Sequence, residues 1–237
     1  MYKQIKSRAG VSGFLLALLV TFSGGALAAG ILGTKHDLST SGGGTIKSTT
    51  QSEICIFCHT PHDAIKNDNI PLWNHTMSAI TTYGVYTSPT LDATDMTDVG
   101  VASLASAAVS NLCLSCHDGT VAVNSFNNPS NLTPVTTMAG GITNITGSAN
   151  LGSAADALKN DHPVNFTYNT ALATADGTLV NPVDAVGSGL SSGVKLYSSK
   201  VQCASCHDPH TSADPTGKAF LRASMTGSTL CFACHNK

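Results

Sequence analysis

The chain has 237 residues, and its 12 Lys+Arg against 14 Asp+Glu give a formal net charge of −2. This balance argues against a protein that binds nucleic acid or an anionic membrane surface, because both attract strongly basic chains. Only 11% of the residues are charged and 5% are aromatic, and with many Ser, Thr, Gly and Asn residues this composition predicts a secreted chain with much irregular loop and little helix.

Residues 1–28 have the pattern of a secretory signal peptide. Lys3, Lys6 and Arg8 precede an apolar run at 11–22, and Ala-Leu-Ala at 26–28 forms a small-residue cleavage site. The apolar run is shorter than the about 20 residues that a membrane-spanning helix needs, so we expect cleavage and no membrane span in the mature chain. Removing this segment takes three of the 12 basic residues and no acidic one, which leaves nine against 14. The mature chain, 29–237, is therefore expected to be exported and acidic.

The pattern C-x-x-C-H occurs four times and uses all eight cysteines of the chain. It is the attachment signature of haem c, in which each thiol forms a thioether to a porphyrin vinyl group and the histidine binds the iron. Four haem c groups are therefore predicted. The attachment residues are Cys55, Cys58, Cys113, Cys116, Cys203, Cys206, Cys231 and Cys234, and the proximal iron ligands are His59, His117, His207 and His235.

Two other uses of the cysteines explain the pattern less well. Four C-x-x-C pairs could form two tetrahedral zinc sites, but zinc gives no reason for a histidine after every second cysteine. A disulfide scaffold would not choose one spacing four times. Because the chain has few aromatic residues for a core, we expect the haems themselves to fill that place.

The four motifs fall into two matching pairs, which predicts a duplicated two-haem module. The first and third share the longer pattern C-x-x-C-H-x-P-H, and a further histidine precedes each pair. We place module one at about 29–123, a polar spacer read as surface loop at about 124–160, and module two at about 161–237. Residues 102–116 are expected to be helical and 194–197 to form a hairpin edge.

Five histidines outside the motifs are available as distal ligands for four irons. His62 and His210 each follow a proximal ligand by three positions, too close to reach the far face of the same haem. Pro61 and Pro209 disfavour helix at the preceding residue and turn these histidines toward a neighbouring haem. We expect four of the five histidines to be distal ligands and the fifth, His75, which has no counterpart in module two, to be structural. The expected pairs are His36 with the first haem, His62 with the second, His162 with the third and His210 with the fourth.

Over most of the mature chain these motifs resemble the four-haem extracellular c-type cytochromes of the doubled C-x-x-C-H type, which polymerise into conductive filaments. The resemblance is carried by residues 35–39, 55–62, 71–75, 114–123, 161–163, 203–210 and 230–237. It implies bis-histidine haems stacked in a continuous chain, mostly irregular coil with a few short helices and minor β-structure, and one distal ligand donated by a neighbouring subunit.

The leading functional hypothesis is electron transfer along such a filament, outside the cell or at its surface, to an external acceptor. The alternatives are a soluble periplasmic four-haem shuttle that docks with redox partner proteins, and a multihaem enzyme. An enzyme needs an iron with an open distal face. Five spare histidines for four irons force no such vacancy, so we expect an electron-transfer protein and not an enzyme.

The filament hypothesis assigns its partners as identical subunits joined head to tail. Because His36 lies close to the expected mature N-terminus and precedes Ser-Gly-Gly-Gly at 41–44, we read this segment as a flexible arm. We expect this arm to donate His36 as the distal ligand of a neighbouring subunit, with His75 as the alternative donor, because exchange of a terminal arm between identical subunits can build a filament. The alternative, left open, is that His36 binds the first haem of its own chain and the protein stays monomeric.

Overall fold

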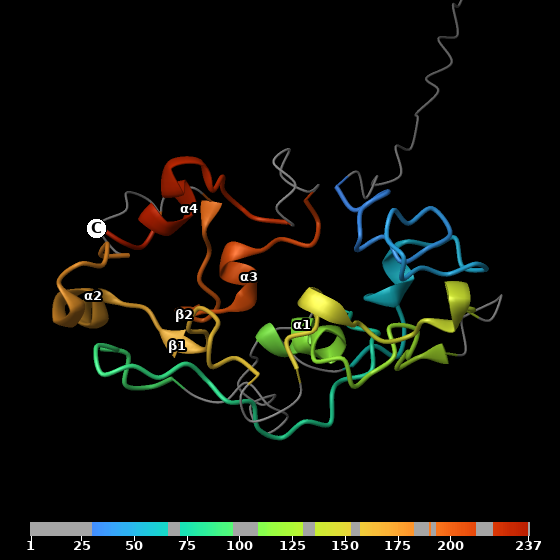
Figure 1. Ribbon diagram of the computed structural model, residues 1–237, viewed down its shortest axis with the longest axis horizontal. Coiled ribbons are helices and arrows are strands. Elements are labelled where there is room, and N and C mark those ends of the chain that lie inside the picture. Colours follow the sequence, from blue (N-terminus) through green and yellow to red (C-terminus); the bar gives the residue numbers. More distant parts are fainter. Residues whose placement is uncertain are drawn as a thin grey trace, which may run out of the picture.

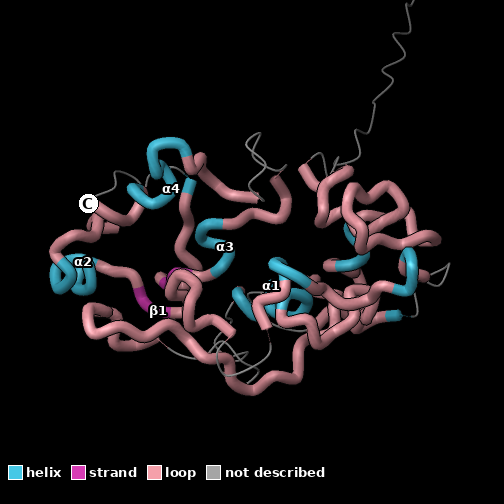
Figure 2. The backbone as a smooth tube through the Cα atoms, viewed as in Figure 1, coloured by secondary structure: helices cyan, strands magenta, loops and turns pink. Residues whose placement is uncertain are grey.

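The computed structural model describes residues 30–65, 72–96, 109–129, 136–152, 157–182, 190, 193–211 and 220–236. Most of these lie in turns and irregular loops (Figure 1, Figure 2). The helices are α1 (Ser110–His117), α2 (Thr170–Asp176), α3 (Cys203–Cys206) and α4 (Thr229–Phe232). Single turns of 3-10 helix are η1 (Cys55–Phe57), η4 (Ala139–Gly141), η5 (Gly147–Ala149) and η7 (Thr226–Ser228). The strands are β1 (Phe166–Thr167) and β2 (Lys200–Val201). Mostly irregular coil with few short helices and a small sheet is thus confirmed for these residues.

Two sequence expectations fall wholly or partly outside this set. The predicted signal peptide, 1–28, lies outside the described residues, as does the first part, 102–108, of the expected helix. The rest of that helix is confirmed, since α1 carries the second motif. Within the described ranges, no helix combines the length and apolar character required to cross a bilayer.

Local sequence explains where the short elements begin and end. The Asn169 side chain accepts a hydrogen bond from Leu172 N at 2.9 Å and so caps the start of α2, while Gly177, with φ of 71°, ends it. Gln202 and Ser205 form a reciprocal capping box at the start of α3. The helical turn that carries the third motif is therefore fixed by the residue directly before its first cysteine.

The small sheet differs in detail from the expected hairpin at 194–197. β1 and β2 pair antiparallel, with Phe166 opposite Val201, and Tyr197 reaches only an isolated bridge to Lys200. The two residues between them, 198 and 199, both have positive φ, as a tight two-residue turn requires. Val194, where the expected hairpin edge begins, is not part of the sheet and is buried in a hydrophobic cluster.

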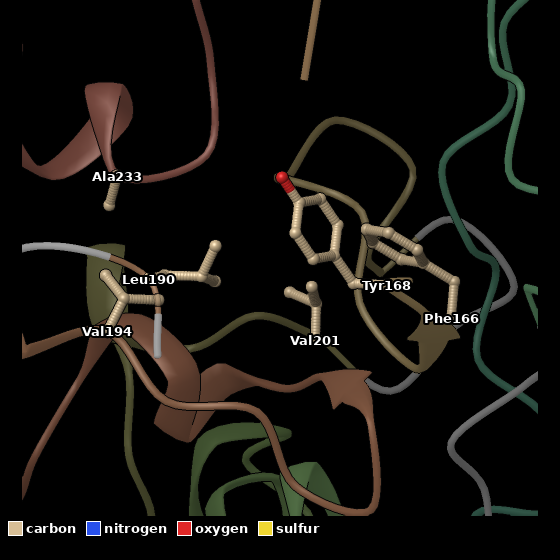
Figure 3. Close-up of a cluster of buried hydrophobic side chains, with 6 residues drawn as sticks. All are labelled: Phe166, Tyr168, Leu190, Val194, Val201 and Ala233. Atoms are coloured by element: carbon tan, nitrogen blue, oxygen red, sulfur yellow. The ribbon is translucent and has the colours of Figure 1, made fainter. Parts of the chain in front are cut away.

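The protein core consists of three small hydrophobic clusters, and each one includes a residue of a C-x-x-C-H motif. Phe57 lies in the first cluster, Leu114 in the second and Ala233 in the third, all at most 1% exposed. Figure 3 shows the third cluster, whose members are Phe166, Tyr168, Leu190, Val194, Val201 and Ala233. The first, second and fourth motifs are thus anchored in the interior through the residues between their cysteines.

Two segments expected to be loose are ordered by contacts. In the described parts of the spacer, 124–129, 136–152 and 157–160, Met138 and Leu158 are both only 4% exposed and join two different clusters, so these parts are not only surface loop. The expected flexible stretch at 41–44 instead forms turns in which Gly42 N donates to Ser39 O at 3.0 Å. A Cβ on Gly42 would lie 2.0 Å from a backbone oxygen, so glycine is needed there for close approach of the chain, not for flexibility.

The first and third motifs are held by the same backbone hydrogen bonds. The residue after the motif histidine donates to the partner segment: Thr60 N to Leu72 O at 2.9 Å, and Asp208 N to Phe220 O at 2.7 Å. The return bonds run from Asn74 N to Cys58 O and from Arg222 N to Cys206 O, both at 2.8 Å. Leu72 and Phe220 also share a positive φ, 54° and 59°. The repeated sequence around the first and third motifs thus has the same local structure at both places. The boundaries of the two modules stay predictions.

Tyr168 ties the fourth motif to the third cluster. Its side chain is 2% exposed, and its hydroxyl donates to Val180 O at 2.6 Å and lies 3.2 Å from Cys234 O. Tyr168→Phe is expected to lower the free energy of unfolding by about 1–2 kcal/mol, because a buried hydrogen-bonding group is lost. Denaturant unfolding followed by circular dichroism measures this change.

Tyr86→Phe is the matched control, because the Tyr86 hydroxyl has no hydrogen-bond partner among the described residues. It should change the unfolding free energy by less than about 0.5 kcal/mol. Equal effects of the two substitutions would show that the Tyr168 hydroxyl does not support the fourth motif.

Candidate haem-binding sites

Each C-x-x-C-H motif forms a single helical turn. η1, α1, α3 and α4 carry the four motifs in order. In the first, third and fourth motifs the histidine N–H closes the turn onto the first cysteine, with His59 N to Cys55 O at 2.8 Å, His207 N to Cys203 O at 3.1 Å and His235 N to Cys231 O at 2.9 Å. Residues three apart lie on the same side of such a turn. Both thiols of a motif can therefore reach one porphyrin edge.

The thiols are in surroundings that keep most of them neutral. Burial, followed by the neighbouring Cys55, raises the pKa of Cys58 to about 11, and burial raises the pKa values of Cys116 and Cys234 as well. Cys203 is the exception, because a hydrogen bond from the Cys113 thiol lowers its pKa to about 7. Among the described residues, no three His, Cys, Asp or Glu side chains are grouped to hold a metal ion by themselves.

Three histidine pairs have the separation expected across a haem iron. The ring centres are 6.0 Å apart for His36 and His117, 6.1 Å for His59 and His210, and 6.4 Å for His162 and His235. With metal–nitrogen bonds of about 2 Å, two imidazoles on opposite sides of one metal have ring centres about 6 Å apart. One member of each pair is the histidine of a motif. These residues therefore fit bis-histidine haem at the first, second and fourth motifs.

The pairs differ from those expected from sequence. His36 and His162 lie beside the second and fourth motifs and not beside the first and third, and His210 lies beside the first motif and not the fourth. The order of the residues in the sequence showed which histidines lie far enough along the chain to reach another motif, but not which motif each one lies beside. The leading segment turns back and packs Leu38 and Ile46 on the first cluster, which carries His36 past the first motif to the end of α1.

His36 is enclosed by its own chain. Its ring stacks on Phe220 at 4.1 Å between centres, and its Nδ1 is buried without a hydrogen-bond partner among the described residues. Burial, and then the neighbouring His117, His207 and His210, lower the pKa of His36 to about 4. The imidazole is therefore neutral at pH 7, which is the form that binds a metal. The expected flexible arm that carries His36 is thus replaced by a packed loop.

The two remaining histidines lie in contrasting places. His62 has an exposed side chain, and its carbonyl accepts hydrogen bonds from Thr60 Oγ1 and Asn128 Nδ2, both at 2.9 Å. His75 is 1% exposed, with Nε2 at 3.0 Å from Ala122 O and Nδ1 at 3.2 Å from Ser115 Oγ. Both ring nitrogens of His75 are thus engaged, as expected for a structural residue.

The motifs follow one another in space in their sequence order. Cys58 of the first motif and Cys116 of the second pack on the same hydrophobic cluster. Cys203 N of the third motif donates to Ser110 Oγ at the start of α1 at 3.0 Å, and Val201, two residues before the third motif, shares the third cluster with Ala233 of the fourth. The first motif thus neighbours the second, the second the third, and the third the fourth.

A buried polar contact joins the second and third motifs, where α1 meets α3 near the centre of Figure 1. Ser110 Oγ donates to Gln202 Oε1 at 2.5 Å and accepts from Cys203 N at 3.0 Å, while Gln202 Nε2 donates to Asn165 Oδ1 at 2.9 Å. Ser110, Gln202 and Asn165 are at most 2% exposed. Sequence reasoning missed these residues. The position of Ser110 and Gln202 shortly before a motif was a signal for those two, and Asn165 had none.

Comparison with known proteins agrees with this chemistry. Residues 197–237, which hold the third and fourth motifs, match the family described as the doubled CXXCH motif. No curated protein matches the chain. The family match, together with the motifs themselves, supports a multihaem c-type cytochrome with covalently bound haem c and a role in electron transfer.

The His59–His210 pair generates a direct test. His210→Ala should leave every haem covalently attached, because attachment depends on cysteines, while one iron loses its distal ligand and becomes high spin. His75→Ala is the matched histidine control and should leave every iron low spin. Visible spectra and electron paramagnetic resonance of the two variants measure the spin state.

Removing the first motif identifies the iron concerned. In a Cys55→Ala/Cys58→Ala background, adding His210→Ala should create no further high-spin iron. A new high-spin signal in that background would show that His210 binds another iron, and would support its original assignment to the fourth haem.

Proposed function

We propose that the protein conducts electrons through four bis-histidine c-type haems as the repeating subunit of an extracellular filament. The observation that carries the proposal is the continuous succession of the four motifs: Cys58 and Cys116 pack on one cluster, Cys203 N bonds to Ser110 Oγ of α1, and the chain beside the third motif shares a cluster with Ala233 of the fourth. Bound haem iron supplies one-electron redox chemistry. Electron transfer falls steeply with distance, so sites that touch in series favour conduction.

The chain's own residues have three tasks in this function. The cysteines of each helical turn hold the porphyrin, the motif histidine binds one face of the iron, and a histidine from a distant segment closes the other face. Closed iron favours electron transfer over catalysis. His/His ligation also lacks the thioether sulfur that raises the potential of His/Met cytochromes, so low reduction potentials are expected.

The His59–His210 pair suggests how subunits join, if the same pairing is repeated across the contact between two subunits. His59 in the earlier C-x-x-C-H-x-P-H motif pairs with His210, the last residue of the later one. Applying the same relation once more pairs His207 with His62 of the following subunit. The exposed side chain of His62 suits this role, whereas His36 is packed within its own chain. A head-to-tail contact that does not close into a ring produces a filament.

Haem content and coordination test the electron-transfer core of the proposal. The mass of the intact protein should show four haem additions, and the assembled protein, once reduced, should bind no carbon monoxide. Fewer haems, or carbon monoxide binding by the assembled form, would contradict a fully six-coordinate four-haem conductor. Negative-stain images of material from the culture surface show whether filaments form, and monomers with four closed haems would favour the periplasmic shuttle.

The donor of the intersubunit ligand is tested separately. His62→Ala should abolish filaments and open one iron, and added imidazole should refill that iron without restoring filaments. His162→Ala is the matched control, because it also opens one iron but removes a ligand that lies beside His235 in the same chain. The control should still form filaments. Persistent filaments in the His62→Ala protein would end the assembly proposal.

A further inference from the structure

The leading segment of the mature chain is organised around one buried carboxylate. Asp37 is 0% exposed, and its two carboxylate oxygens accept four hydrogen bonds. The donors are Gly33 N at 2.9 Å, Ser39 N at 3.1 Å, Ser39 Oγ at 2.6 Å and Ser41 Oγ at 2.7 Å. All four come from residues within four positions of Asp37. The carboxylate therefore fixes the backbone on both sides of the neighbouring His36.

Further bonds hold His36 from its N-terminal side. His36 N donates to Thr34 Oγ1 at 3.2 Å, and Thr34 Oγ1 itself donates to Ile31 O at 2.6 Å. Asp37 N donates to Thr34 O at 3.2 Å. The backbone of His36 thus has little freedom before any metal ligand is added. Prior ordering of a ligand reduces the entropy that coordination has to overcome.

The ring of His36 is aimed by packing from the other half of the chain. It stacks on Phe220 with an angle of 15° between planes, and Phe220 is 5% exposed. On its other side His117 lies 6.0 Å away, and Nδ1 remains buried without a partner in the described structure. A buried polar atom without a hydrogen bond is costly unless a ligand such as a metal satisfies it.

We infer that Asp37 is a positioning residue that holds His36 as the distal ligand of the iron bound by His117, with Phe220 supporting the ring. The inference rests on the proposed function, since it requires a haem at the second motif. The Asp37 carboxylate bonds only to the neighbouring backbone and serines in the described structure, so Asp37 acts through His36. Partners outside the ligand shell typically change metal affinity by about 10- to 100-fold when they are removed.

Carbon monoxide competition measures this effect, because carbon monoxide can bind the reduced second iron only when His36 leaves it. Asp37→Ala should retain all covalent haem and raise the apparent carbon monoxide affinity of one iron at least about tenfold. Asp37→Asn, which keeps one acceptor oxygen, should give an intermediate increase. Ser39→Ala and Ser41→Ala each remove one hydroxyl donor and should give smaller increases, so they provide the test if Asp37→Ala does not accumulate.

Asp95 offers the matched control. Its carboxylate also organises backbone, accepting from Thr167 N at 3.0 Å and from Thr167 Oγ1 at 2.5 Å, but it holds no distal histidine. Asp95→Ala should leave carbon monoxide affinity at the wild-type value. An increase equal to that of Asp37→Ala would mean that general loosening of the fold opens the iron, which would overturn the inference.

A double variant shows whether Asp37 acts through His36. His36→Ala alone should open the second iron, and His36→Ala/Asp37→Ala should bind carbon monoxide at the same single iron with no further gain in affinity. A second opened iron in the double variant would overturn the inference. So would unchanged carbon monoxide affinity in Asp37→Ala, while His36→Ala still opens one iron and the proposed function stands. If His36→Ala opens none, the His36–His117 ligation proposed for this iron is what fails.

Discussion

The structure depends on one constraint, which is that two cysteines three positions apart and the next histidine must occupy a single helical turn. Helical turns this short are not stable alone, because nucleation fixes several residues for one hydrogen bond. Each turn is therefore held by chain from elsewhere, as when Thr60 bonds to Leu72 or Tyr168 to Cys234. This requirement accounts for the low content of regular structure. Most of the chain between motifs is there to brace a turn or to deliver a ligand, and neither task needs a long helix or a wide sheet.

Ligand delivery also ties distant parts of the chain together. His36 and His117 are separated by much of the first half, and His59 and His210 belong to different halves. Under the proposed ligation, an iron bound between such residues would close a long loop and restrict the unfolded chain as other cross-links do. Phe220 adds to the connection, because it comes from the second half and packs on a ligand of the first. Residues from distant parts of the sequence thus pack on one another at the candidate sites.

The sequence predicted the motifs, the helix that carries the second of them and the irregular fold, because these follow from local patterns. It did not predict which histidine meets which motif. Proline after a motif histidine turns the chain away, but the direction depends on contacts such as those of Asp208 with Arg222, at 2.8 Å. The burial of Asp37 and its hydrogen bonds were missed for a related reason. Ser-Gly-Gly-Gly has the composition of a flexible segment, and the sequence does not show that the Ser41 hydroxyl donates to the Asp37 carboxylate. Met138 was likewise hidden in a spacer whose composition resembles surface loop.

The contact between the second and third motifs shows why a polar junction suits a conducting chain. An apolar interface tolerates sliding, whereas a buried network in which Ser110, Gln202 and Asn165 satisfy one another permits one arrangement, because any shift leaves a polar group unpaired. A fixed gap at this junction matters, since a single wide gap would limit transfer through the whole series. At the two ends the requirement is the opposite, because electrons must enter and leave. Cys55 in the first motif and Cys231 in the last are exposed, while the cysteines of the two middle motifs are more enclosed. A fixed interior junction between two more accessible ends is consistent with the electron transfer proposed above.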